Sequence, residues 1–366
     1  MADDIGTIDW LTLMYKYYFS SLFSLTLLRA INTIYPLVGY VVLVRTFSST
    51  EFSDYIFSMS VIAFIRLFTF YGFESFGVDI IAKCNRTKNY RKNSFILGIL
   101  IIQVCLYAVS SLAALVILTL LSLDHRLVFT CLLIPFFEIF RVQWYFLGIQ
   151  RIGYYTKFHL WAGPIYISIF YAIYNNLTEM LYVPLIYIIS IFVPSIFCWI
   201  HACKIKVIQI ALPRLKTIYF LLVRSTTLFK SRSLAVVNQE AVSLVLGANG
   251  AVDQLIIYDF MKKIVEFSKI PNAIINQAIS PLISAGRDKI LIRRTVAIRF
   301  FLSVISYIIT VLFIEPASEV ITGMQLNNLT YYILIYGTLI VLAPMNYFYS
   351  SSVLLPFKDI IFLLLN

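Results

Sequence analysis

Charged side chains stand within the long apolar runs of this sequence. The cations are Arg29, Arg66, Arg141, Lys230, Arg232, Lys262 and Lys263, and the acids are Glu138, Glu240, Asp259 and Glu266. An ionisable group at bilayer depth costs about 3 kcal/mol on insertion scales, so such groups pair with one another or line a cavity. Because the cations outnumber the acids, the sequence predicts a cavity that favours an anionic cargo.

Phosphate suits such a cavity, because an arginine guanidinium group can donate two parallel hydrogen bonds to it and a lysine ammonium group supplies a mobile positive charge. We therefore predict that a diphosphate or an anionic sugar binds to one set of cations: Arg29, Arg66, Arg141, Lys230, Arg232 and Lys263. The acids are candidates for ion or proton coupling, because burial raises the pKa of a carboxyl group toward neutrality. These candidates are Glu138, Glu240, Asp259 and Glu266.

A plainer interpretation stays open for several of these groups. Asp259, Lys263 and Glu266 are spaced four and three residues apart, and Glu138 precedes Arg141 by three, so each set can form ion pairs within one helix. Arg29 and Lys230 can instead extend toward the membrane surface. Arg66 and Arg232 have no acid at such spacing, so their partner must come from another helix, water, lipid or substrate.

The elements that carry these groups are predicted to be membrane-spanning helices. The chain of 366 residues is 60% hydrophobic and only 13% charged, with a mean hydropathy of +0.87, whereas soluble chains carry about 25% charged residues. The apolar runs are continuous and long enough to cross a bilayer, which takes about 20 residues. We expect an all-α polytopic membrane protein with about ten complete spans. These are 20–44, 52–76, 93–121, 128–148, 159–174, 181–202, 228–247, 252–279, 296–314 and 329–348.

The net charge of +11 indicates topology rather than nucleic-acid binding. Lysines and arginines gather in alternate loops, around residues 83–92, 204–216 and 287–294. Basic loops stay on the cytoplasmic side. We therefore expect a multi-pass protein with its N-terminus in the cytoplasm and no nucleic-acid partner.

The chain is predicted to form two helical lobes around a central cavity. Residues 1–203 form a six-helix lobe, residues 204–216 a basic cytoplasmic linker and residues 217–366 a second lobe. The last apolar run, 359–365, is too short to span, so we expect this lobe to be incomplete. Repeated halves of this kind are frequent in secondary transporters.

The motifs of common enzymes and metal sites are missing from the sequence. It contains no G-x-x-x-x-G-K-[ST] nucleotide loop and no H-E-x-x-H zinc motif. Cys198, His201 and Cys203 lie close together but lack a second ligand pair. We expect neither an enzyme nor a bound metal or cofactor.

Three stretches of the chain resemble polysaccharide and O-antigen flippases, the Wzx-type group of the multidrug/oligosaccharidyl-lipid/polysaccharide exporter superfamily. The first is Leu28-Arg29 with 52–57 and 71–73, which is similar to the family's opening helix pair. The second, 144–150 with Tyr154 and Tyr155, is similar to its aromatic turn after the fourth helix. The third resembles its seventh and eighth helices, and comprises 246–258, Lys263, Ile270-Pro271 and 279–284.

The resemblance implies a bacterial inner-membrane flippase. Its cargo would be an undecaprenyl-diphosphate-linked oligosaccharide, moved from the cytoplasmic to the periplasmic leaflet by alternating access within membrane lipid. It further implies diphosphate contacts at Arg29, Lys230 and Lys263, and an O-antigen polymerase and a chain-length regulator as candidate partners. A drug or cation exporter of the same superfamily, an O-antigen polymerase or acyltransferase, and an inactive membrane protein are the alternatives.

Overall fold

The computed structural model describes residues 26–28, 35–86, 92–120, 125–174, 179–204, 211–273, 275, 289–323 and 329–348. These parts of the chain are helical and contain no strand. They form two compact units, Met1–Leu255 and Ile256–Asn366. The lobe boundary predicted at 204–216 stays a prediction; the compact units divide later along the chain.

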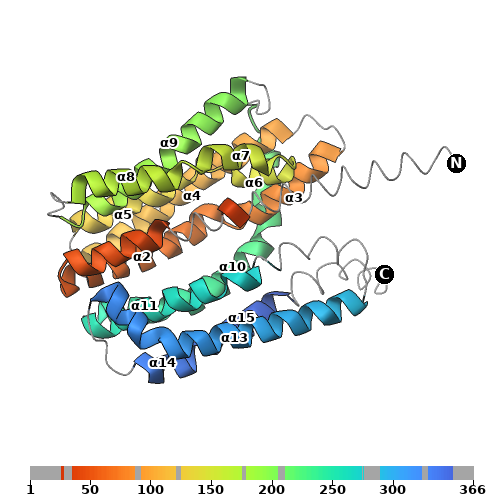
Figure 1. Ribbon diagram of the computed structural model, residues 1–366. Helices are drawn as coiled ribbons and strands as arrows, with labels where there is room; N and C mark the ends of the chain where they lie inside the picture. Colours follow the sequence, from red (N-terminus) through yellow and green to blue (C-terminus); the bar gives the residue numbers. More distant parts are fainter. Residues whose placement is uncertain are drawn as a thin grey trace. The chain divides into compact units, whose positions relative to one another are not determined.

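Unit 1 is a bundle of helices that pack in a continuous series. Helix α2 contacts α10, α4 and α5, while α5 contacts α9, and α9 contacts α8 (Figure 1). The bounds are α2 (Ser49–Phe70), α3 (Phe73–Arg86), α4 (Lys92–Leu120), α5 (His125–Glu138), α6 (Gln143–Gly148), α7 (Ile152–His159), α8 (Ala162–Tyr174), α9 (Tyr182–Lys204) and α10 (Leu215–Ala248).

Unit 2 is smaller and is described by itself. Its helices are the greater part of α11 (Val252–Ser268), then α13 (Lys289–Thr322), α14 (Leu329–Tyr336) and α15 (Leu339–Phe348). Helix α13 contacts both α14 and α15, and the Ser268 hydroxyl lies 2.8 Å from that of Thr310, which joins α11 to α13.

Six helices among the described residues are long and apolar enough to cross a membrane. They are Ser49–Asn85, Asn93–Val116, Arg126–Gly148, Tyr182–Lys204, Ile292–Thr322 and Leu329–Asn346. Each overlaps one of the predicted spans, which confirms a polytopic α-helical membrane protein. The total of about ten spans stays a prediction.

Three of these six spans are interrupted: Leu329–Asn346 breaks at residues 337–338, between α14 and α15, and the other two breaks lie in unit 1. The first of these two lies at Tyr71 and Gly72, which both have positive φ and separate α2 from α3. The second follows Glu138, where residues 139–142 separate α5 from α6. Helix α5 carries Pro135 close to its end, and proline weakens helical hydrogen bonding at such a position. Irregular backbone at membrane depth is tolerated where protein or a cavity surrounds it.

The two interrupted spans of unit 1, Ser49–Asn85 and Arg126–Gly148, pack against each other on both sides of their interruptions. Helix α2 contacts α5, and α3 contacts α6. The second contact depends on small residues: a Cβ at Gly77 would lie 2.6 Å from the Trp144 ring, and one at Gly148 would lie 3.0 Å from the Val78 carbonyl oxygen. Small residues let membrane helices approach closely, so these glycines allow α3 and α6 to pack against each other.

We predict that the break between α2 and α3 requires a glycine at position 72. Its φ is +79°, and an added Cβ would lie 2.9 Å from Leu228 Cβ and 3.1 Å from the Phe229 nitrogen. We expect Gly72→Ala to lower the free energy of unfolding by about 2–4 kcal/mol, because backbone strain and overpacking add. Thermal unfolding of the purified protein measures this change.

Gly250 supplies a matched control for that variant. Its φ is +67°, but an added Cβ would meet no atom within 4 Å. Gly250→Ala should therefore cost only the strain of about 1–2 kcal/mol. Equal losses in the two variants would contradict the close packing of Gly72 on α10.

Candidate functional site

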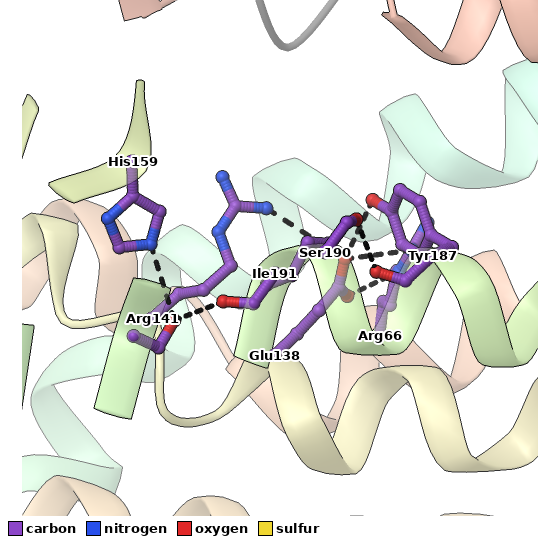
Figure 2. Close-up of polar contacts among 8 residues, drawn as sticks. Arg66, Glu138, Arg141, His159, Tyr187, Ser190 and Ile191 are labelled. Carbon is purple, nitrogen blue, oxygen red and sulfur yellow. Dashed lines mark hydrogen bonds and ion pairs between the residues drawn. The ribbon is translucent and has the colours of Figure 1, made fainter. Parts of the chain in front are cut away.

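The break between α5 and α6 holds a carboxylate that two arginines share. Arg66 on α2 forms a bidentate salt bridge with Glu138. Its Nε donates to Oε2 at 2.7 Å, and its Nη2 donates to Oε1 at 2.9 Å. Arg141 approaches the same carboxylate with Nη1 3.9 Å from Oε1, and the Tyr187 hydroxyl donates to Oε1 at 3.3 Å. Figure 2 shows Arg66 and Tyr187 on one side of Glu138 and Arg141 on the other.

The local helix ends explain why this carboxylate needs two cations. Glu138 is the last residue of α5, where the helix dipole disfavours negative charge and favours a cation such as Arg141. The Glu138 side chain is only 7% exposed, whereas Arg66 and Arg141 are 28% and 23% exposed. The carboxylate is therefore enclosed, while the two arginine side chains are partly exposed.

A second ion pair lies at the other break. Arg232 Nη1 on α10 is 2.6 Å from Glu74 Oε2. Glu74 lies in the first turn of α3, where the helix dipole favours an acid. Both side chains are nearly half exposed, at 44% and 48%, so this pair is more open than the one at Glu138.

Both ion pairs line one cavity of about 670 Å³ within unit 1. The charged lining residues are Arg66, Arg141, Arg232, Glu74, Glu138 and Glu240. These described residues carry three positive and three negative formal charges. The described lining therefore has no net formal charge, whereas the sequence predicts a cationic excess; Glu74, near the end of the predicted span 52–76, supplies the third acid.

Five of the predicted site residues come together in this cavity. They are Arg66, Arg141, Arg232, Glu138 and Glu240. Of the other five, Lys230 is exposed on α10 and is not part of the described lining. Asp259 and Lys263 form an ion pair within α11, and Glu266 is exposed on the same helix, in unit 2. Arg29 lies outside the described residues. The intrahelical alternative therefore holds for Asp259 and Lys263.

Aromatic and polar groups behind Arg141 extend the site into the bundle. The rings of Tyr155 and His159 stack with centroids 3.8 Å apart, and His159 Nε2 lies 3.3 Å from the Ser195 hydroxyl oxygen. Burial raises the pKa of Tyr155 to about 12, against the opposing effect of Arg141. This tyrosine therefore stays protonated across the physiological range.

Eleven of the sixteen lining residues were not predicted as site residues, among them the polar residues Glu74, Gln143, Tyr187 and Gln239. Glu74 carried a sequence signal, because it is an acid at the end of an apolar run. Tyr187 and Gln239 carried none, since neither side chain is charged and only the fold brings them to the cavity.

A comparison with models of protein families shows the family of this chain. Residues 19–286 match the model of the family described as polysaccharide biosynthesis protein. The chain belongs to the polysaccharide biosynthesis protein family. The matched region includes both interrupted spans of unit 1 and every residue of the described cavity lining. No curated protein and no solved structure gives a significant match to the chain.

Membership of this family agrees with a membrane protein that handles a lipid-linked saccharide. The bilayer location and the charged cavity are both suited to a molecule with an apolar tail and a polar head. The Wzx-type specificity suggested by the sequence stays a proposal.

The shared carboxylate yields a stability prediction. Glu138→Gln leaves two partly enclosed guanidinium groups without a negative partner, so we expect it to lower the free energy of unfolding by about 3 kcal/mol. Thermal unfolding in one detergent measures the change.

Asp79→Asn is the control, because Asp79 pairs with Lys83 at 2.7 Å but both side chains are more than half exposed. Exposed pairs contribute about 0–1 kcal/mol. If Glu138→Gln lowered the free energy of unfolding as little as Asp79→Asn does, the Glu138 carboxylate would not stabilise the site.

Proposed function

We propose that this protein is a flippase for an undecaprenyl-diphosphate-linked saccharide, which it moves from the cytoplasmic to the periplasmic leaflet of the bacterial inner membrane. The observation that carries the proposal is the cavity at the two helix breaks, where partly open arginines face a single space. The family match supports the substrate class. We propose a transporter rather than an enzyme.

Arg141 and Arg232 are the proposed diphosphate ligands. Arg141 lies beyond hydrogen-bond distance of Glu138, at 3.9 Å, and Arg232 is 44% exposed. Guanidinium groups bind phosphate oxygens through paired hydrogen bonds. In the proposal, the diphosphate replaces carboxylates that keep these arginines paired while the cavity is empty.

Glu138 is the proposed switch between the empty and loaded cavity. When the cargo displaces Glu138 from the arginines, Arg66 and Arg141 become available to phosphate oxygens. Alternating exposure of the cavity would then re-expose the headgroup to the periplasm. Glu240, which is buried at the same cavity, is the second coupling candidate.

An exporter of cationic compounds is the second candidate function. It is favoured by the equal numbers of carboxylates and guanidinium groups in the described lining. Uptake of a lipophilic cation into proteoliposomes that contain the protein distinguishes it from the flippase.

We predict that Arg141→Ala and Arg232→Ala each slow the flipping of a lipid-linked saccharide in proteoliposomes by about tenfold or more. Hydrogen bonds to charged groups contribute about 1.5–3 kcal/mol, which corresponds to such a loss. Flipping is measured by the accessibility of the saccharide to an external lectin or glycosidase.

Arg224→Ala is the matched control, since Arg224 lies on α10 beside the Phe220 ring and outside the described cavity lining. It should keep wild-type flipping. Lys230→Ala in the same assay tests the role predicted for Lys230. Normal flipping in both the Arg141 and the Arg232 variant would overturn the proposed headgroup site.

A further inference from the structure

The backbone of the interruption between α5 and α6 is held by a side chain of α9. In a continuous helix the Phe140 carbonyl oxygen would accept a hydrogen bond from the backbone nitrogen of Trp144, four residues later. Residues 139–142 leave the helix, and the same oxygen accepts from the indole Nε1 of Trp199 at 2.9 Å. The indole thus supplies the donor that a regular helix would supply.

This hydrogen bond lies at membrane depth. The interruption is part of the candidate span Arg126–Gly148, and its residues Ile139 and Val142 are each only 1% exposed. Hydrocarbon offers no hydrogen-bond partner to a carbonyl group. Loss of the indole donor would therefore leave a buried acceptor unsatisfied, which costs more than the loss of an exposed hydrogen bond.

The peptide group that Trp199 holds is the one that leads into Arg141. Its oxygen belongs to Phe140 and its nitrogen to Arg141, and the six atoms around a peptide bond lie in one plane. The Arg141 nitrogen donates to the Glu138 carbonyl oxygen at 2.9 Å, so the plane is held at both its oxygen and its nitrogen. Because the Cα of Arg141 is one of the six atoms, this plane sets where the Arg141 side chain begins.

Aromatic contacts hold the same segment against α9. The Phe192 ring lies against the rings of Phe137 and Phe140, with centroid distances of 4.6 and 5.7 Å and interplanar angles of 73° and 68°. Phe192 and Trp199 are seven residues apart, so both contacts come from one face of α9. Helix α9 therefore fixes the interruption by a hydrogen bond and by a cluster of rings.

Arg141 depends on its backbone more than Arg66 does. Arg66 forms two hydrogen bonds with the Glu138 carboxylate, whereas Arg141 Nη1 stays 3.9 Å from it, beyond hydrogen-bond distance. A guanidinium group that its partner holds less firmly is placed chiefly by the point where its side chain begins. The support from α9 therefore acts on an arginine that we propose as a diphosphate ligand.

We propose that Trp199 is a positioning residue for the headgroup site: its indole N–H fixes the peptide group before Arg141 and so keeps the Arg141 guanidinium group at the cavity. This inference rests on the proposed function. Trp199 is not part of the described cavity lining. It acts through Arg141 and does not contact the cargo.

The first test measures the placement of Arg141 without any cargo. Trp199→Phe keeps an aromatic ring but removes the N–H donor. Phenylglyoxal modifies guanidinium groups, and mass spectrometry of peptides from the full-length protein in nanodiscs gives the rate at each arginine. We expect Trp199→Phe to raise the rate at Arg141 by about threefold or more, as loss of one hydrogen bond allows. The rate at Arg232 should not change, because Arg232 lies at the same cavity but on α10.

Trp161→Phe is the matched control. It makes the same substitution at a tryptophan that is 65% exposed and lies between α7 and α8, so both rates should stay as in the wild type. An unchanged rate at Arg141 in Trp199→Phe would overturn the inference. Equal rises at Arg141 and Arg232 would also overturn it, because they would mean that the whole cavity has loosened.

The second test asks whether Trp199 acts through Arg141 in transport. We expect Trp199→Phe to slow the flipping of the lipid-linked saccharide in proteoliposomes by about three- to tenfold, the range of one hydrogen bond. The same loss should appear when Trp199→Phe is combined with Arg232→Ala, because the effects of independent sites add. It should be absent in combination with Arg141→Ala, and an equal loss there would overturn the inference.

The two tests separate this inference from the proposed function. A selective rise at Arg141, in a protein that does not flip the saccharide, supports the positioning of Arg141 by Trp199 and counts against the proposed function. Normal flipping by Trp199→Phe, beside a wild type that flips the saccharide, counts against the inference alone.

Discussion

One carboxylate that two arginines share governs the site of this protein. Glu138 ends a helix inside an apolar bundle, where both burial and the helix dipole disfavour its charge. Arg66 from α2 and Arg141 from the following break provide the compensating charge. Because Arg66 comes from a different helix, the same contact ties the two interrupted spans together.

The interruptions follow from local sequence and from close packing. Gly72 allows the left-handed turn that ends α2, and the backbone of α10 occupies the space where a side chain would be. The opposite break places Arg141 beyond the last turn of α5, so that its side chain can approach Glu138 from the side away from Arg66 (Figure 2). A continuous helix at either position would remove the space that the cavity occupies.

The sequence predicted the class of fold and many of the charged groups, but not their pairing. Hydropathy alone located all six spans that the described residues contain, and helical spacing alone identified the Asp259–Lys263 pair. The Arg66–Glu138 pair joins residues 72 positions apart, and only packing decides which of several intramembrane acids meets a given arginine. The position of α10 against α2 was likewise beyond prediction, since a basic linker precedes that helix and suggested a new lobe there.

The charge balance of the cavity changes how an anionic cargo would be held. A lining of arginines alone would keep unpaired cations in the bilayer whenever the cavity was empty. Three glutamates in the described lining offset that charge, so in the proposed function the binding of an anionic cargo would exchange one negative partner of the arginines for another.

The most direct measurement is protection of a cavity position by cargo. In a variant whose five native cysteines are replaced, Ala235→Cys places a thiol in the described cavity lining. The rate of its reaction with a small membrane-impermeant maleimide is then compared with and without an undecaprenyl-diphosphate-linked saccharide. The account predicts saturable protection at Ala235→Cys and none at Ala108→Cys, which lies outside the cavity. An unchanged reaction rate at Ala235→Cys under saturating saccharide would contradict it.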